Sequence, residues 1–183
     1  MPTVRNWQTA AAPVEGYIVP LGEGAEHPFF KGGASGRPAA GVLAGTASTG
    51  GLIAVEEGVL EPGQPGPYRH YHLHVAELFY VLDGEILLQI GGHVEQAGPG
   101  TFAFCPTGCV HAFRALGSEP ARVLIMAMPP GQAEGYFREL DKLPREASEA
   151  EWEALGKKWG TIVVGPPLES DADAPRYARQ VVD

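Results

Sequence analysis

The sequence has few cysteines and few basic residues, and each shortage excludes a class of protein. The two cysteines, Cys105 and Cys109, cannot build a disulfide scaffold, and their separation matches no standard zinc motif. We therefore expect both to be reduced thiols. The 13 basic side chains stand against 22 acidic ones and give a net charge of −9. Phosphate binding needs a cluster of basic side chains, and a chain with this excess of acidic residues offers no such cluster. Nucleic acids and anionic membranes are therefore poor partners.

Long apolar segments are also missing. No stretch reaches the roughly 18 consecutive apolar residues that a membrane span requires. Residues 1–16 contain no secretory apolar segment. We therefore expect a cytoplasmic protein.

Glycine and proline, in contrast, are abundant, with 25 and 17 of the 183 residues. They are spread along the chain, which favours short elements joined by tight turns. With 44% hydrophobic residues the chain can bury a core, and its length fits one domain. We predict a single all-β domain over residues 1–183. Its β-core lies at about 41–130, with an N-terminal arm at 1–40 and a helical tail at 131–183.

Residues 68–128 carry the strand signals. Short apolar runs between turn residues predict strands at about 68–73, 77–83, 85–90, 101–105, 109–115 and 121–128. Such spacing is typical of a sandwich or barrel. After Pro129-Pro130-Gly131 the periodicity becomes helical, and Ser148 with Glu151 forms a capping box for a second helix. Residues 161–165 could form a further strand, and residues 171–183 look like a loose tail.

Three of the six histidines, His70, His72 and His74, lie within five residues. On a β-strand His70 and His72 share one face about 7 Å apart, so both imidazoles could bind one metal ion. Neutral imidazole is the commonest protein ligand for borderline first-row metals. We interpret His27 and His93 as solvated surface residues.

Glu77 is the natural third ligand, although a regular strand through His72 would point it the other way. A bend at 74–76 resolves this conflict and takes His74 off the strand, so the role of His74 stays open. His111 follows a turn at 106–108 that would bring another strand alongside. Three histidines and a carboxylate suit nickel, manganese, iron, cobalt, copper or zinc (Ni, Mn, Fe, Co, Cu or Zn), with one or two positions left for water, substrate or dioxygen.

The spacing of these residues resembles the two motifs of the cupin superfamily. The first motif corresponds to His70-x-His72, four residues, Glu77, six residues and Gly84, and the second to Gly100, five residues, Pro106-x-Gly108, two residues and His111. The chain departs from the pattern at Ala115, where the second motif usually has Asn, and it lacks the leading glycine of the first motif. The resemblance implies a cupin jelly-roll β-barrel that holds one divalent metal ion on His70, His72, Glu77 and His111.

Residues 17–168 are also similar to single-domain quercetinase-like cupins. The shared strings are Thr49-Gly50-Gly51, Val55-Glu56, residues 79–85 and Val164-Gly165-Pro166-Pro167. This resemblance implies a metal-dependent dioxygenase for a small aromatic or enolic substrate, with flavonol ring opening as one such reaction. It gives Glu77 the catalytic role of general base toward a substrate hydroxyl. Candidate residues for an apolar substrate pocket are Tyr68, Tyr71, Phe79, Phe113 and Met126.

Other functions would use the same ligands. One alternative is a non-redox isomerase, cyclase or hydratase, which would continue to turn over without dioxygen. Another is a non-catalytic small-ligand binder.

Cys105 lies in an apolar run and is expected to be buried, although a redox role for Cys105 and Cys109 is conceivable. Open sheet edges and apolar faces favour the pairing of two chains. The resemblance to cupins also implies a dimer, so a homodimer is expected. The identities of metal and substrate cannot be read from this pattern.

Overall fold

The computed structural model describes residues 16–20, 23, 25–26, 41–140, 142–144 and 147–169. Most of the expected N-terminal arm, His27 and the tail at 171–183 lie outside these residues. Neither helix in the described part of the chain has the length and apolar character of a membrane span.

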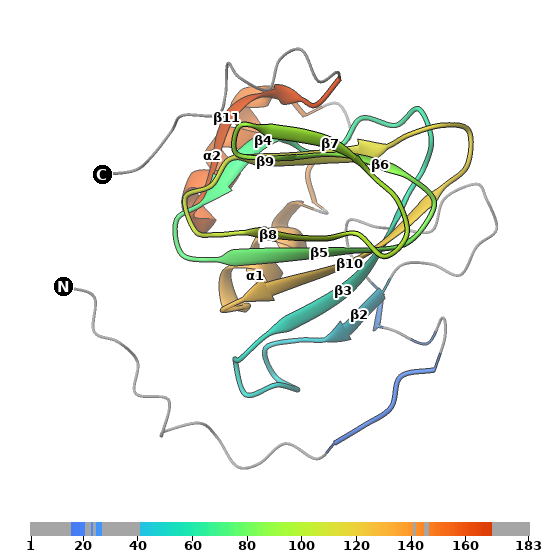
Figure 1. Cartoon of the computed structure of the whole chain (residues 1–183). Helices are drawn as coiled ribbons and strands as arrows, with labels where there is room; N and C mark the ends of the chain where they lie inside the picture. Colours follow the sequence, from blue (N-terminus) through green and yellow to red (C-terminus); the bar gives the residue numbers. More distant parts are fainter. Residues whose placement is uncertain are drawn as a thin grey trace.

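The described residues form a mainly β structure with two short helices near the C-terminal end (Figure 1). The strands are β1 (Ala25–Glu26), β2 (Gly41–Ala44), β3 (Ala54–Leu60), β4 (Tyr68–His72), β5 (Ala76–Asp83), β6 (Ile86–Ile90), β7 (His93–Ala97), β8 (Phe102–Cys105), β9 (His111–Ala115), β10 (Ala121–Met128) and β11 (Thr161–Pro167). The helices are α1 (Gly131–Leu140) and α2 (Glu149–Trp159). All six predicted strands between residues 68 and 128 are present, with ends shifted by no more than two residues.

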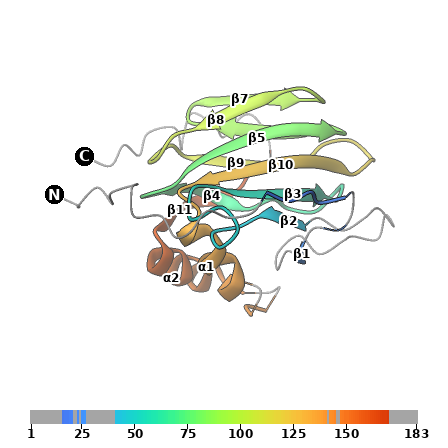
Figure 2. The same cartoon turned by 90° about the horizontal axis from the view of Figure 1, so that it is seen from below.

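Two antiparallel sheets face each other across the core (Figure 1). One has six strands in the order β1-β2-β3-β10-β5-β8, and the other has five in the order β11-β4-β9-β6-β7. The all-β prediction is thus confirmed, in the form of two facing sheets. Figure 2 shows both helices at the side of β11, opposite β7 and β8.

The glycine that ends the first motif is required by the backbone. Gly84 lies between β5 and β6 with φ 71°, a conformation that L-residues rarely adopt. A Cβ atom at Gly84 would also come within 2.7 Å of the Ala121 backbone. The tight turn therefore needs glycine for two separate reasons.

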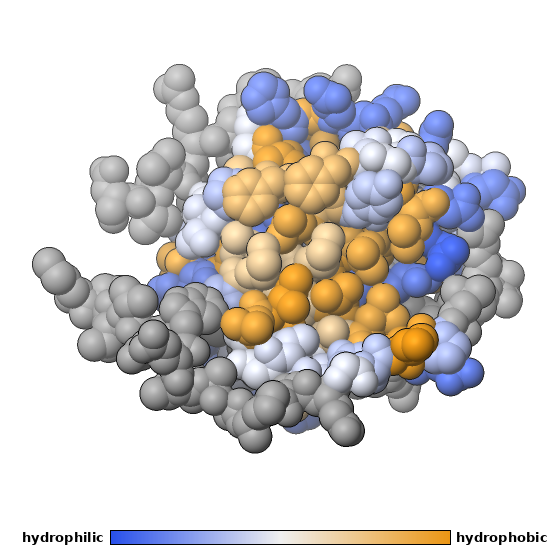
Figure 3. All heavy atoms as spheres, turned by 60° about the horizontal axis from the view of Figure 1, so that its bottom comes forward, coloured by the Kyte–Doolittle hydropathy of each residue, from blue (hydrophilic) through white to orange (hydrophobic). Residues whose placement is uncertain are grey.

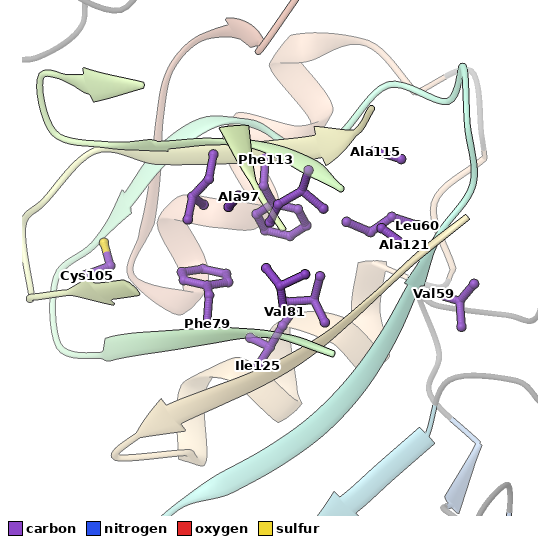
Figure 4. Close-up of a cluster of buried hydrophobic side chains, with 13 residues drawn as sticks. Val59, Leu60, Phe79, Val81, Ala97, Cys105, Phe113, Ala115, Ala121 and Ile125 are labelled. Carbon is purple, nitrogen blue, oxygen red and sulfur yellow. The ribbon is translucent and has the colours of Figure 1, made fainter. Parts of the chain in front are cut away.

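The core lies between the two sheets. It includes Phe79 and Val81 from β5, Phe113 from β9 and Ile125 from β10, which point toward one another in Figure 4. The outward face of the six-stranded sheet is also apolar, and Figure 3 shows a broad hydrophobic surface on this side. In β5 and β10, therefore, apolar residues occupy both faces.

The second predicted helix begins as its sequence indicates. The Ser148 hydroxyl accepts a hydrogen bond from the Glu151 amide, and the Glu151 carboxylate accepts one from the Ser148 amide at 2.7 Å. This capping box satisfies amides that would otherwise lack partners at the helix start. After Gly160 the chain enters β11, which pairs with β4, so the C-terminal segment joins the sheet that carries His70 and His72.

Candidate metal centre

The structure brings His70, His72, Glu77 and His111 together. One potential donor atom from each residue lies within 4.8 Å of the other three. Two histidines come from β4 and one from β9, where His70 pairs directly with His111 across the sheet. Glu77 comes from β5 in the opposite sheet, so the four residues join the two layers.

The predicted bend between β4 and β5 gives Glu77 its orientation. β4 ends at His72 and β5 begins at Ala76, and the intervening residues form a bend. This break in the alternation lets Glu77 face the same interior as His72. His74 lies in the bend, is exposed and does not belong to the donor cluster. His93, at the start of β7, is exposed as well.

Each imidazole is held through its Nδ1 atom. The partners of Nδ1 are the Tyr68 carbonyl at 2.7 Å for His70, Thr161 Oγ1 at 3.0 Å for His72 and the Cys109 carbonyl at 3.1 Å for His111. A carbonyl only accepts hydrogen bonds, so Nδ1 carries the proton in His70 and His111 and Nε2 keeps its lone pair. Such contacts orient a metal-binding histidine.

The Nε2 atoms of His72 and His111 point toward Glu77. They lie 3.3 Å and 2.9 Å from its two carboxylate oxygens, and both Nε2 atoms are buried without a well-aligned hydrogen bond. A first-row metal about 2.1 Å from each donor places neighbouring donors roughly 3–4 Å apart, and the two separations of 3.3 Å and 2.9 Å are close to this range. Orphaned imidazole nitrogens beside a buried carboxylate therefore fit a divalent transition metal, and these four side chains could hold one.

The charges of the cluster are strongly coupled. Burial and the neighbouring His111 and His72 lower the pKa of His70 well below its usual value. For Glu77, burial alone would raise the pKa, but the close approach of the His72 and His111 imidazoles brings it well below the usual range. Burial opposes the charge on His111, yet the Glu77 carboxylate 2.9 Å away outweighs it and raises the pKa of His111. Glu77 is therefore an anionic carboxylate among imidazoles.

A pocket opens from the donor cluster and encloses about 570 Å³ of atom-free space, including its open mouth. Its lining consists of Pro67, Tyr68, His70, His72, Glu77, Phe113, Ile125, Tyr136, Phe137, Leu140, Trp152 and Val163. His70, His72 and Glu77 are the charged or imidazole groups, and the remaining wall is apolar or aromatic. The donors therefore stand at one end of a largely apolar space.

The five candidate pocket residues divide between the pocket and the surrounding structure. Tyr68 and Phe113 line the pocket. Phe79 lies deeper, in the core, with its ring 5.9 Å from that of His111. Tyr71 and Met126 are not part of the lining, because each alternates with a residue that faces inward: Tyr71 with His70 and His72, and Met126 with Ile125.

Sequence reasoning missed the contribution of the helical tail. Tyr136, Phe137 and Leu140 of α1, Trp152 of α2 and Val163 of β11 all reach the pocket. Trp152 also packs against Tyr68, with ring centroids 5.5 Å apart. The apolar face of α1 is visible in the sequence, but the wall that it covers is decided by tertiary packing.

Two thiols lie behind His111. Cys105 is buried, as expected, and its sulfur lies 3.2 Å from His111 Nδ1 and 3.4 Å from the Cys109 carbonyl. A hydrogen bond from Cys105 lowers the pKa of the Cys109 thiol to about 6. Hydrogen bonding to Cys109 and burial raise the pKa of Cys105. Both cysteines are free thiols in the structure.

Comparison with known proteins finds similarity over part of the chain. A family model described as "Cupin domain" matches residues 57–135. The quercetin 2,3-dioxygenase of Bacillus subtilis (strain 168) is 35% identical over 71 residues, which are 39% of this chain and 20% of that enzyme. The match thus spans about a fifth of the relative's length.

Solved structures were also compared. A protein with a double-stranded β-helix domain from Klebsiella pneumoniae subsp. pneumoniae MGH 78578 is 26% identical with a TM-score of 0.45, covering 55% of this chain and 84% of that chain. The polyketide cyclase RemF from Streptomyces resistomycificus is 26% identical with a TM-score of 0.44, covering 49% of this chain and 63% of that chain. The cupin-domain match contains all four donor residues and both motifs, so residues 57–135 are similar to cupin domains.

Proposed function

We propose that this protein is a metal-dependent dioxygenase that acts on a small aromatic or enolic substrate. The observation that carries the proposal is the set of three imidazoles and one carboxylate at the end of an apolar, aromatic-walled pocket. The quercetin 2,3-dioxygenase relative, 35% identical over 71 residues, supports a reaction of the same type here.

The pocket wall favours a planar and mostly apolar ligand. Phe113, Phe137 and Trp152 offer aromatic surfaces, and Ile125 and Leu140 add aliphatic ones. A ligand rich in hydroxyl or phosphate groups would lose hydrogen bonds to water against such a wall, at a cost of about 1–3 kcal/mol for each unpaired group. The donor cluster instead suits a ligand whose few oxygen atoms lie on one edge.

Two side chains are placed to handle the protons of such a substrate. The Glu77 carboxylate is anionic and reaches the pocket, so it can accept the proton of a substrate hydroxyl. Burial and the charge of Glu77 raise the pKa of Tyr136, so its hydroxyl stays protonated and can donate a hydrogen bond to substrate. When bound, a divalent transition metal supplies a Lewis acid that makes a coordinated hydroxyl more acidic.

Elemental analysis of the purified protein, followed by oxygen-electrode assays with the flavonol quercetin and simpler enolic aromatics, tests the proposal. We expect about one transition-metal ion per chain and oxygen consumption that depends on the aromatic compound. His72→Ala should lower both metal content and oxygen uptake at least tenfold, because it removes a donor from the cluster. His74→Ala is the matched control, since His74 is exposed and lies outside the cluster.

Two outcomes would count against the proposal. Protein that stays free of metal after incubation with each candidate ion would remove its chemical basis. Conversion of the substrate at an unchanged rate under anaerobic conditions would support a non-redox isomerase, cyclase or hydratase in its place.

A further inference from the structure

Two free thiols lie at the ends of the turn that leads into His111. Cys105 ends β8 and is only 2% exposed, whereas Cys109 is half-buried at the other end of the turn. The Cys109 amide donates to the Pro106 carbonyl at 3.0 Å, which closes the turn between the two cysteines. One thiol therefore lies inside the protein, and the other lies near its surface.

The two side chains are close enough to interact directly. A hydrogen bond joins the Cys105 and Cys109 thiols, and the Cys105 sulfur lies 3.4 Å from the Cys109 carbonyl. Figure 4 shows the Cys105 sulfur directed from β8 toward the opposite sheet. A disulfide would require the sulfurs to move only from hydrogen-bond contact to a bond length of about 2.05 Å. Small rotations of two side chains in one turn can provide this movement.

Cys109 is the thiol that a small reagent can reach. A Cβ atom at Gly91, in the turn between β6 and β7, would lie 3.6 Å from the Cys109 sulfur, so the glycine leaves this side of the thiol uncovered. Cys105, in contrast, belongs to the buried core between the sheets. An oxidant should therefore react first at Cys109, and Cys105 should react only with the modified Cys109.

The inner thiol also contacts a donor residue of the candidate metal centre. The Cys105 sulfur lies 3.2 Å from His111 Nδ1, while Nε2 of the same ring faces Glu77 at 2.9 Å. His111 Nδ1 also donates to the Cys109 carbonyl at 3.1 Å. Both cysteines therefore contact the atom that orients this ring, and contacts of this kind influence how tightly a histidine holds a metal ion.

The same turn contacts the strand that carries the other two histidines of the cluster. The Gly108 amide, between the two cysteines, donates to the His72 carbonyl at 2.9 Å. A shift of the turn would thus be transmitted to the His72 backbone as well as to the His111 ring. Two of the four donor residues therefore depend on the geometry of residues 105–109.

We propose that Cys105 and Cys109 form an oxidation site, at which a hydroperoxide converts the two thiols into an intramolecular disulfide that loosens His111. The Cys109 sulfur attacks a peroxide oxygen: an S–O bond forms, the O–O bond breaks, and the other oxygen leaves with the thiol proton as an alcohol or, from hydrogen peroxide, as water. The Cys105 sulfur then attacks the sulfenic acid, so that the S–S bond forms, the S–O bond breaks and water leaves with the second thiol proton. The thiols lose two electrons in total, and the peroxide gains them.

The disulfide would change the contacts of His111 Nδ1. The Cys105 sulfur would move away from Nδ1 toward the Cys109 sulfur, and the Cys109 carbonyl would turn with its residue. The metal affinity of the cluster should then fall about 10- to 100-fold, the usual loss when a partner of a metal-binding histidine is removed. The expected loss of affinity rests on the metal centre of the proposed function, whereas formation of the disulfide does not.

Treatment of the reduced, full-length, metal-free protein with hydrogen peroxide tests this inference. The number of free thiols should fall from two to none, and the intact mass should drop by two hydrogen atoms. Titration against a competing chelator before and after the treatment should show the loss of metal affinity. Dithiothreitol should restore both the thiols and the affinity, which distinguishes the disulfide from methionine oxidation, since sulfoxides need dedicated reductases.

Two matched variants each keep one thiol and cannot form the disulfide. Cys109→Ser replaces a half-buried sulfur with oxygen at little change of shape, and the metal affinity of this variant should be the same before and after peroxide. Cys105→Ala should hold Cys109 at the sulfenic acid, which labelling with dimedone detects. A peroxide-dependent loss of affinity that persists in Cys109→Ser would overturn the inference.

Other results would contradict separate parts of the proposal. Two thiols that survive the peroxide, or a disulfide that links two chains, would overturn it entirely. An intramolecular disulfide that leaves the metal affinity unchanged would remove its effect on His111. A reduced protein that binds no metal would count against the proposed function and against that effect, and the thiol count and mass would still decide whether the disulfide forms.

Discussion

At the scale of single residues, the hydrogen-bond partner of each imidazole Nδ1 atom determines how firmly that ring is oriented for binding a metal ion. Backbone carbonyls hold His70 and His111, and these contacts depend only on the local course of the strands. His72 relies on a side chain, Thr161, which lies 89 positions later in the sequence. This contact is therefore the one that a single substitution can remove.

Thr161→Val should lower the metal affinity of the protein by about 10- to 100-fold, because valine keeps the shape of threonine but cannot accept a hydrogen bond from His72 Nδ1. Titration against a competing chelator measures this change. Thr161→Ser keeps the hydroxyl and should retain most of the affinity. Equal affinities for the valine variant and the wild type would show that His72 is oriented by packing alone.

The donor residues could be predicted from sequence because their spacing is local. His70 and His72 share a strand face, and the turn residues before His111 set its distance from Glu77 in the motif. Thr161 and Tyr136 could not be predicted in the same way. Their roles depend on where β11 and α1 pack, and no short spacing encodes that placement.

At the scale of elements, the two helices meet at a glycine. A Cβ atom at Gly135 of α1 would lie 2.2 Å from the Trp159 ring of α2, so the helices can approach this closely only without a side chain there. Since α1 and α2 supply Tyr136, Leu140 and Trp152 to the pocket, their spacing also determines its width.

Gly135→Ala should lower the free energy of unfolding by about 1–3 kcal/mol, as overpacked substitutions do. Alanine favours helix by about 1 kcal/mol over glycine, so helix propensity alone predicts the opposite sign. Urea denaturation distinguishes the two. Gly98→Ala serves as the control, because no atom lies within 4 Å of a Cβ at that position. A stabilised Gly135→Ala protein would mean that the helices are free to separate.

The strands and the capping box were predictable at this scale, since period-two patterns and the Ser148–Glu151 pair act over a few residues. The positions of the helices beside β11 were not predictable. An amphipathic helix of two or three turns can cover any apolar edge, and the sequence does not indicate which edge is left open.

At the scale of the whole molecule, the buried cluster links stability to pH. His70 has a lowered pKa in the folded protein, so it resists protonation there, whereas in the unfolded chain it takes up a proton below about pH 6.5. The unfolded state then binds more protons, and stability falls as the pH falls. Glu77 acts in the same sense at lower pH. Its lowered pKa stabilises the folded protein while the carboxylate is ionised, and this stabilisation is lost once Glu77 is protonated in both the folded and the unfolded state.

We expect the free energy of unfolding of the metal-free protein to fall between pH 6.5 and 5, with a slope of at most about 1.4 kcal/mol per pH unit from His70. His111 has a raised pKa and therefore acts in the opposite sense only above about pH 6.5, where its folded-state proton is lost. Denaturation at pH 5, 6 and 6.5 measures the slope. His70→Gln should flatten it, and His74→Gln should not; a slope unchanged in His70→Gln would assign the effect to other groups.

The pairing of β11 with β4 also has a consequence for biosynthesis. The strand that carries His70 and His72 has a single directly paired residue with β9, and its long ladder is formed with residues 161–167. A ribosome finishes the cupin motifs about fifty residues before it has made this strand. While the chain is still being translated, His72 therefore lacks its contact with Thr161, and the nascent protein completes its candidate metal centre only after β11 has emerged from the exit tunnel.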